Sequence, residues 1–223
     1  MNKIKDYNGG GDMTRRGFLS GLLAVGSAVL LSARDKLTDG GLAPLTEKKH
    51  PKREIPLVPP GSISVKNFYT HCTACQLCIA ACPNGLLKPS GEVDRFMQPV
   101  MSYDNGYCRP ECTRCSQICP TGAIRSITES EKTDISIGQA RVDIKNCLAA
   151  NGIAPCGVCE RHCPVQVITM MKLDSNDGSG LLRRRPVVSE HRCIGCGACE
   201  NSCPVNPVSA IRVVARIVHT EIS

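Results

Sequence analysis

The sequence is poor in the residues that fill ordinary protein cores. Its 223 residues include no tryptophan, three phenylalanines and four tyrosines, so aromatic side chains make up only 3% of the chain. A chain of this length holds one domain or two small ones. With so few large rings to bury, a conventional core of that size is not expected. Something other than aromatic packing must organise the fold.

The sequence also lacks the signatures of several common protein classes. Its main apolar run, residues 21–31, is about 11–13 residues long at most, well short of the roughly 20 that span a bilayer as a helix. No glycine-rich phosphate loop, nucleotide-binding fingerprint or nucleophile–base constellation is recognisable. These gaps argue against a nucleotide-dependent enzyme, a hydrolase and a membrane-spanning protein.

What the sequence has in excess is cysteine, sixteen in all. They form four runs, and each run ends in the pattern C-x2-C-x3-C-P. The runs are Cys72, Cys75, Cys78 and Cys82; Cys108, Cys112, Cys115 and Cys119; Cys147, Cys156, Cys159 and Cys163; and Cys193, Cys196, Cys199 and Cys203. The first and fourth runs begin C-x2-C, whereas the first gap grows to three residues in the second run and to eight in the third. The four runs leave no cysteine over.

The spacing C-x2-C-x2-C-x3-C-P is that of bacterial [4Fe–4S] ferredoxins. Three closely spaced thiolates wrap one corner of the cluster, and in two-cluster ferredoxins the fourth reaches the other cluster. The following proline turns the chain away. The runs therefore predict four [4Fe–4S] clusters bound by all sixteen cysteines. Disulfides in an exported protein and zinc sites remain as alternatives, but neither explains a proline after every fourth cysteine.

The formal net charge of +7 would suggest nucleic acid as a partner if it were read alone. Residues 1–33 carry a net +2, and an oxidised cluster with four thiolates contributes about −2. Four clusters would therefore more than cancel the remaining +5, and no nucleic-acid partner is predicted. Because little core remains once the clusters are removed, folding should depend on metal.

The N-terminal region resembles an export signal. Arg15 and Arg16 precede a weakly apolar run that ends in Ser32 and Ala33, which is typical of a twin-arginine (Tat) signal. The alternative is a basic turn before a buried helix. We expect a signal region over 1–33 and a proline-rich extended linker over 34–66. Two outcomes are open for the signal: cleavage after Ala33, or retention, in which case it would tether the protein at the membrane surface.

From residue 66 onward the chain repeats a short apolar approach, a Cys run and a short apolar exit. Residues 141–144 and 186–188 are predicted approach strands, and residues 122–124, 167–170 and 210–214 predicted exit strands. The polar stretches 126–138 and 174–185 are predicted surface loops. His71 and His191, which precede their runs closely, are candidates for hydrogen bonding near a cluster.

These features predict an α+β fold of two bacterial-ferredoxin-like modules. Because the first and fourth runs share one spacing, we expect them to pair, with residues 67–83 and 186–216 as an outer module and residues 84–185 as a module nested inside it. The four ligand sets would then be Cys72, Cys75, Cys78 and Cys203; Cys193, Cys196, Cys199 and Cys82; Cys108, Cys112, Cys115 and Cys163; and Cys147, Cys156, Cys159 and Cys119. Consecutive pairing, first with second and third with fourth, is the rival.

The twin arginine, the Pro59-Pro60-Gly61-Ser62 segment, Phe68 before the first run and the four runs in order resemble the exported ferredoxin-type proteins of periplasmic nitrate reduction and methylamine oxidation systems, the MauM/NapG group. The resemblance covers about 14–214. It implies a periplasmic electron carrier between a membrane quinol-oxidising partner and an exported redox enzyme or cytochrome. The alternatives are a small subunit of a larger exported oxidoreductase, a redox enzyme with its own substrate site, and an assembly factor.

Overall fold

The computed structural model describes residues 38–39, 43–44, 48, 53–173 and 183–222, and the chain divides into two compact units, 1–46 and 47–223. The first unit shows a pair of two-residue antiparallel strands, β1 (Thr38–Asp39) and β2 (Ala43–Pro44). The predicted export signal lies outside the described residues. No helix within the described ranges is long and apolar enough to cross a membrane.

The second unit mixes short helices with antiparallel strand pairs, which confirms the α+β class. Its elements are α2 (Val65–His71), α3 (Leu77–Ala81), β3 (Leu87–Pro89), η1 (Val93–Arg95), β4 (Pro99–Met101), α4 (Arg114–Gln117), α5 (Glu129–Thr133), β5 (Ile135–Val142), η2 (Ile144–Asn146), α6 (Val158–Arg161), β6 (Ile168–Lys172), β7 (Arg184–Val188), η3 (Glu190–Arg192), α7 (Ala198–Ser202) and β8 (Ile211–Glu221).

The N-terminal module, residues 53–127, is built around the first two Cys runs. Helices α3 and α4 pack against each other, and the hairpin β3–β4 pairs Leu87 with Met101. Helix α2 begins at Ser64, whose side chain accepts the N–H of Asn67 as an N-cap. It buries Phe68 in a core shared with several cysteines of these runs. Thiols therefore form part of the packed interior, as the scarcity of aromatic residues requires.

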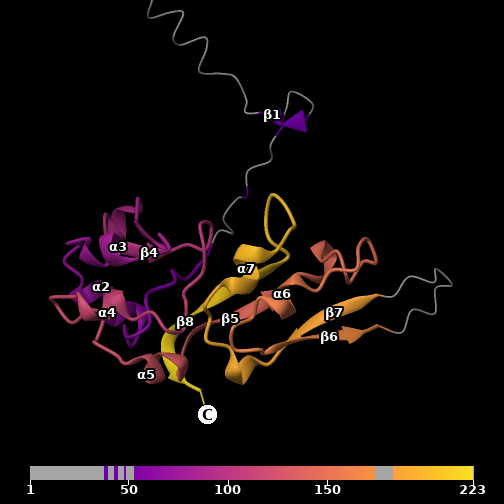
Figure 1. Cartoon of the computed structure of the whole chain (residues 1–223). Coiled ribbons are helices and arrows are strands. Elements are labelled where there is room, and N and C mark those ends of the chain that lie inside the picture. Colours follow the sequence, from indigo (N-terminus) through magenta and orange to yellow (C-terminus); the bar gives the residue numbers. More distant parts are fainter. Residues whose placement is uncertain (1–37, 40–42, 45–47, 49–52, 174–182, 223) are drawn as a thin grey trace, which may run out of the picture. The chain divides into compact units, whose positions relative to one another are not determined.

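The C-terminal module, residues 135–222, contains the third and fourth Cys runs. Strand β5 pairs with β8, β6 pairs with β7, and α6 packs against α7. Figure 1 shows β5 and β8 lying between the helices of the N-terminal module and the β6–β7 hairpin. The predicted strands at 167–170, 186–188 and 210–214 are confirmed as parts of β6, β7 and β8, whereas β5 ends at Val142, before the predicted boundary at 144.

The proline-rich segment before the first run is not an extended linker over its whole predicted length. Leu57 and Val58 are fully buried, and Pro59 and Ser62 are buried with them. Leu57 accepts the backbone N–H of Met101 at 3.0 Å. The prediction of a tether is therefore wrong for residues 53–62: proline lacks an amide donor, but its ring is apolar and packs well in a core.

Two further predictions are wrong. Residues 122–124 form bends instead of a strand, although Ala123 and Ile124 are buried. The stretch 126–138, predicted as a surface loop, contains α5 and the start of β5. Helix α5 begins with a capping box in which Thr128 and Glu131 exchange side-chain hydrogen bonds with each other's backbone N–H. The Thr128-x-x-Glu131 pattern marks the start of a helix, but the stretch around it is so polar that its composition indicates a loop.

Strand β8 extends beyond its own module to the N-terminal module. Val218 forms an antiparallel bridge with Ser64, and the backbone N–H of His219 donates to the carbonyl of Ile63 at 2.8 Å. The N–H of Ile222 donates to the carbonyl of Asp134 at 2.7 Å. The two modules are thus joined by backbone hydrogen bonds as well as by packing.

Candidate metal centres

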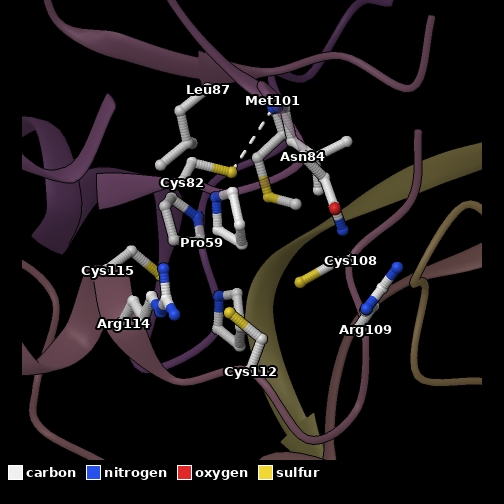
Figure 2. A pocket seen from close by; sticks show the side chains of 13 residues that line it. Pro59, Cys82, Asn84, Leu87, Met101, Cys108, Arg109, Cys112, Arg114 and Cys115 are labelled. Carbon is white, nitrogen blue, oxygen red and sulfur yellow. Dashed lines mark hydrogen bonds between the residues drawn. The ribbon is translucent and has the colours of Figure 1, made fainter. Parts of the chain in front are cut away.

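Three quartets of cysteines each line one cavity. The inner N-terminal site consists of Cys82, Cys108, Cys112 and Cys115 (Figure 2). The inner C-terminal site consists of Cys163, Cys193, Cys196 and Cys199. The outer C-terminal site consists of Cys147, Cys156, Cys159 and Cys203. In each quartet three thiols come from one run and the fourth from its partner run.

The remaining four cysteines form the outer N-terminal site. Burial, together with the neighbouring thiolates of Cys72, Cys75 and Cys119, raises the pKa of Cys78 to about 11. Cys72 directly follows α2, and Cys78 lies in α3. Cys119 comes from the second run, just beyond α4, so this site too takes its fourth thiol from the partner run.

The nested pairing predicted from the spacings is therefore wrong. Cys203 lies with Cys147, Cys156 and Cys159, not with the first run, and Cys82 lies with the second run, not with the fourth. The runs pair consecutively, and the two modules follow each other along the chain. Spacing symmetry misleads because a longer first gap only enlarges one loop. The gap does not determine which helix packs beside the run, as α3 does on α4 and α6 on α7.

The loop conformations of the first and fourth runs explain how a short chain segment curls around a site. Gly195 and Gly197 have φ of 77° and 81° in the fourth run, and Ala74 and Gln76 occupy the same left-handed region at the equivalent positions of the first. Such φ values are unfavourable for residues with a Cβ. The repetition of this conformation without glycine indicates that the thiol arrangement itself imposes the turn.

Backbone amides point at the sulfur of the fourth cysteine in several runs. The N–H of Leu86 donates to Cys82 Sγ at 3.4 Å, that of Ile124 to Cys119 Sγ at 3.4 Å, and that of Val167 to Cys163 Sγ at 3.5 Å. A sulfur acceptor is strengthened by negative charge, so these donors suit thiolates that carry a cluster.

Electrostatics show that the quartets suit a cationic metal core. Burial, with smaller contributions from Cys108, Cys112 and Cys78, raises the pKa of Cys115 to about 12. Burial, with smaller contributions from Cys147 and Cys156, likewise raises the pKa of Cys159 to about 11. Four such thiols ionise together only when metal ions compensate their charge. The donor sets, the apolar cavities and the amide donors therefore fit four [4Fe–4S] clusters.

The two alternatives find little support in the structure. All sixteen cysteines lie within the described residues, and each is a free thiol. In that part of the chain no group of three or more His, Cys, Asp or Glu side chains is arranged around a single metal ion.

The two inner sites meet at the contact between the modules. The backbone N–H of Cys108 donates to the carbonyl of Cys196 at 2.9 Å, and the side chain of Cys108 packs with Cys196 and Ile194. Nearby, the buried hydroxyl of Tyr103 donates to the carbonyl of Gly195 at 2.5 Å. One ligand loop of each module is thus fixed directly to a ligand loop of the other.

The histidines selected from the sequence do not form the polar surroundings of the sites. His71 is exposed and its Nδ1 lies 2.8 Å from the Asn67 carbonyl of its own helix, and His191 is exposed as well. The side chain that sequence reasoning missed is Lys132 of α5, which is buried beside the second run. The capping box at Thr128 is the signal that would have placed it on a helix.

Comparison with known proteins agrees with consecutive modules. The family described as "4Fe-4S dicluster domain" matches twice, at residues 71–123 and 154–207. The first match contains the first and second Cys runs, and the second contains the fourth run and the third run without Cys147. Two dicluster domains give the chain four [4Fe–4S] clusters and a ferredoxin-type role in electron transport.

Several characterised proteins are similar over most of the chain. The methylamine utilization ferredoxin-type protein MauM of Methylobacillus flagellatus is 32% identical over 70% of this chain and 66% of its own length. MauM of Methylorubrum extorquens is 34% identical over 62% of this chain and 64% of its own length, so the chain spans slightly less than two thirds of these MauM proteins. The ferredoxin-type protein NapG of Escherichia coli is 32% identical over 78% of this chain and 71% of its own length. With two dicluster modules and these relatives, the chain belongs to the MauM/NapG family of ferredoxin-type iron–sulfur proteins.

Proposed function

We propose that this protein is a periplasmic electron carrier, without a substrate site of its own, that passes electrons between a membrane quinol-oxidising protein and an exported redox enzyme or cytochrome. Each bound [4Fe–4S] cluster stores and releases a single electron. The proposed ligands are the four quartets defined above: Cys72, Cys75, Cys78 and Cys119; Cys82, Cys108, Cys112 and Cys115; Cys163, Cys193, Cys196 and Cys199; and Cys147, Cys156, Cys159 and Cys203.

The observation that carries this proposal is that the four sites form one unbroken series. Within the N-terminal module, Cys78 of the outer site raises the pKa of Cys115 of the inner site, after burial and nearer thiols. Between the modules, the inner sites meet at Cys108 and Cys196. The C-terminal module completes the series, because Cys159 of the outer site lies close enough to Cys199 of the inner site to contribute to its raised pKa, which burial dominates.

The exposure of the cysteines supports electron exchange with partners through the outer sites. Cys193, Cys196 and Cys199 of the inner C-terminal site are all buried, whereas Cys75 of the outer N-terminal site is exposed and Cys147 of the outer C-terminal site is half-buried. The outer N-terminal site thus reaches the surface, whereas all four cysteines of the inner C-terminal site are buried; the cysteines of the other two sites are half-buried. A partner at each end would exchange electrons with an outer site, and the inner sites would connect them.

The periplasmic location and the two partners are supported by the sequence alone. Arg15 and Arg16 precede a short apolar run, as in signals that export folded proteins with their cofactors assembled. The residues concerned lie outside the described part of the chain.

The test begins with anaerobically purified full-length protein. It should be brown and hold about 16 iron atoms per chain. Membranes of the source organism should reduce it when supplied with quinol, and a periplasmic extract should reoxidise it, with no small substrate consumed by the protein alone. Reduction that is irreversible, or turnover of a small substrate by the isolated protein, would contradict the proposal.

A further inference from the structure

Lys132 is a buried lysine whose ammonium group lies against the ligand loop of the inner N-terminal site. Only 4% of the Lys132 surface is exposed to solvent. The Nζ atom donates to the carbonyl of Arg109 at 2.5 Å and also to the carbonyl of Cys112. Both carbonyls belong to the loop that joins Cys108 to Cys112, so the ammonium group is held directly behind two of the four thiols of this site.

The charge of Lys132 acts on the sulfurs of that site. Burial raises the pKa of Cys108, and the charge of Lys132 and a hydrogen bond from it oppose that rise. The same charge opposes the rise in the pKa of Cys115. The ion pairs found between described residues do not include Lys132. A buried cation needs a negative partner, and the thiolates of this quartet supply it.

Among the described residues, the hydrogen bonds found to the carbonyls of Cys193–Cys196 in the other inner site come from neutral groups. Lys48 binds the fourth run further along, at the carbonyls of Glu200, Asn201 and Cys203. Arg216 is the positive group that acts on Cys193, and its effect on the raised pKa is smaller than those of burial and two backbone hydrogen bonds. The Arg216 side chain is only half-buried and donates to Ser136 Oγ at 3.1 Å. The two inner sites therefore differ in their charge surroundings.

We propose that Lys132 is a positioning residue that raises the reduction potential of the cluster in the inner N-terminal site and so holds the electron on the N-terminal side of the contact between Cys108 and Cys196. A nearby buried positive charge stabilises the reduced state, which carries one more negative charge than the oxidised state. The proposal rests on the electron-carrier function above, because it assigns one site of the series a specific task.

The experiment compares Lys132→Met and Lys132→Gln with the unmodified protein in redox titrations followed by electron paramagnetic resonance. The glutamine variant keeps an amide donor for the loop carbonyls and removes only the charge. In both variants one centre should become harder to reduce by about tenfold, a shift of about 59 mV for a one-electron couple. Lys132→Arg keeps the charge, so the reduction potential of this centre should stay close to that of the unmodified protein.

The shifted centre is assigned with a third variant. Cys112→Ser alters the inner N-terminal site, so the centre that moves in Lys132→Gln must be the one changed in Cys112→Ser. Lys145→Met is the matched control, because Lys145 is exposed, lies close to the third run, and has a charge screened by solvent. In Lys145→Met the equilibrium constant for reduction of each of the four centres should change by less than about twofold.

Two results would overturn the proposal while leaving the carrier function standing. One is the failure of Lys132→Gln to shift the centre that Cys112→Ser alters, whether all four potentials stay unchanged or a different centre moves. The other is loss of about four irons per chain in both neutral variants, which would make Lys132 an assembly residue. Failure of the carrier function itself would look different, because the unmodified protein would then show no reversible centres.

Discussion

The amide of Cys108 and the carbonyl of Cys196 are joined by a 2.9 Å hydrogen bond, although the two residues belong to different modules. Each is a proposed ligand of an inner site. This backbone bond connects the two ligand loops directly, and the side-chain hydroxyl of Tyr103, which donates to the carbonyl of Gly195, supports the same contact. The bond between Cys108 and Cys196 uses main-chain atoms alone, so substitution of a side chain does not remove its donor or its acceptor.

Consecutive pairing predicts which cysteine substitutions alter the same centre. Cys203→Ser and Cys156→Ser should both perturb the outer C-terminal centre, because their thiols line one cavity. Electron paramagnetic resonance of the reduced protein should show the same signal altered in both variants. Cys75→Ser serves as the control and should change a different signal. If Cys203→Ser changed the signal that Cys75→Ser changes, the first and fourth runs would share a centre and the nested pairing would be correct.

A matched pair of glycine substitutions tests the contact between modules. At Gly197, φ is 81° and an added Cβ would overlap the Tyr103 ring, whereas at Gly122 φ is 70° and nothing lies within 4 Å of an added Cβ. Gly122→Ala should cost about 1–2 kcal/mol of backbone strain alone. Gly197→Ala should cost about 2–3 kcal/mol more, because it also forces Tyr103 out of a packed interface.

The measurement for this pair is the guanidinium concentration at which the visible absorption of the clusters is lost, taken anaerobically. Gly197→Ala should lose its absorption at a clearly lower concentration than Gly122→Ala. Equal midpoints for the two variants would show that the contact between Tyr103 and the fourth run contributes little to stability.

His219 predicts a loss of stability in mild acid. Burial lowers its pKa from 6.5 to about 4. Among the described residues neither ring nitrogen has a hydrogen-bond partner. Because its pKa is depressed in the folded state, His219 binds a proton more readily in the unfolded chain. Its contribution to the free energy of unfolding is therefore fully present above pH 6.5 and is lost as the pH falls toward 4. Between pH 7 and pH 5 the loss should be about 2 kcal/mol.

Comparison of His219→Leu with the unmodified protein at pH 7 and pH 5 isolates this effect. The leucine variant should lack the extra acid loss, while Thr220→Leu, an exposed neighbour on β8, should retain it. The guanidinium midpoint at each pH is the readout. An acid loss of the same size in His219→Leu would assign it to the clusters or to other groups.

Export is predicted to depend on Arg15 and Arg16. Replacing both with lysine keeps the charge but removes the pair that the twin-arginine receptor reads. The double variant should accumulate in the cytoplasm with its clusters, as shown by cell fractionation and iron content. Its arrival in the periplasm with clusters intact would show that residues 14–33 are not such a signal.

The cluster type, the number of clusters and the α+β class could be predicted from the sequence, because thiol spacing is a local property that a short segment such as Cys72 to Pro83 contains in full. The assignment of individual cysteines to clusters stays a prediction. Pairing could not be predicted in the same way. It depends on which helices pack together, and the length of the gap between Cys147 and Cys156 says nothing about that. Composition also misled at Pro59 and at Lys132, since a proline can be core and a lysine can be buried once a ligand loop offers it carbonyls.

The bridge between Ser64 and Val218 has a consequence for the order in which the protein matures. During synthesis the first module emerges long before β8, which follows all sixteen cysteines along the chain. The edge of the first module near Ser64 therefore stays open on the ribosome until the second module has been made. A chain interrupted before β8 would lack this bridge altogether. The backbone contact between Ser64 and Val218 therefore forms only after every proposed cluster ligand has been synthesised.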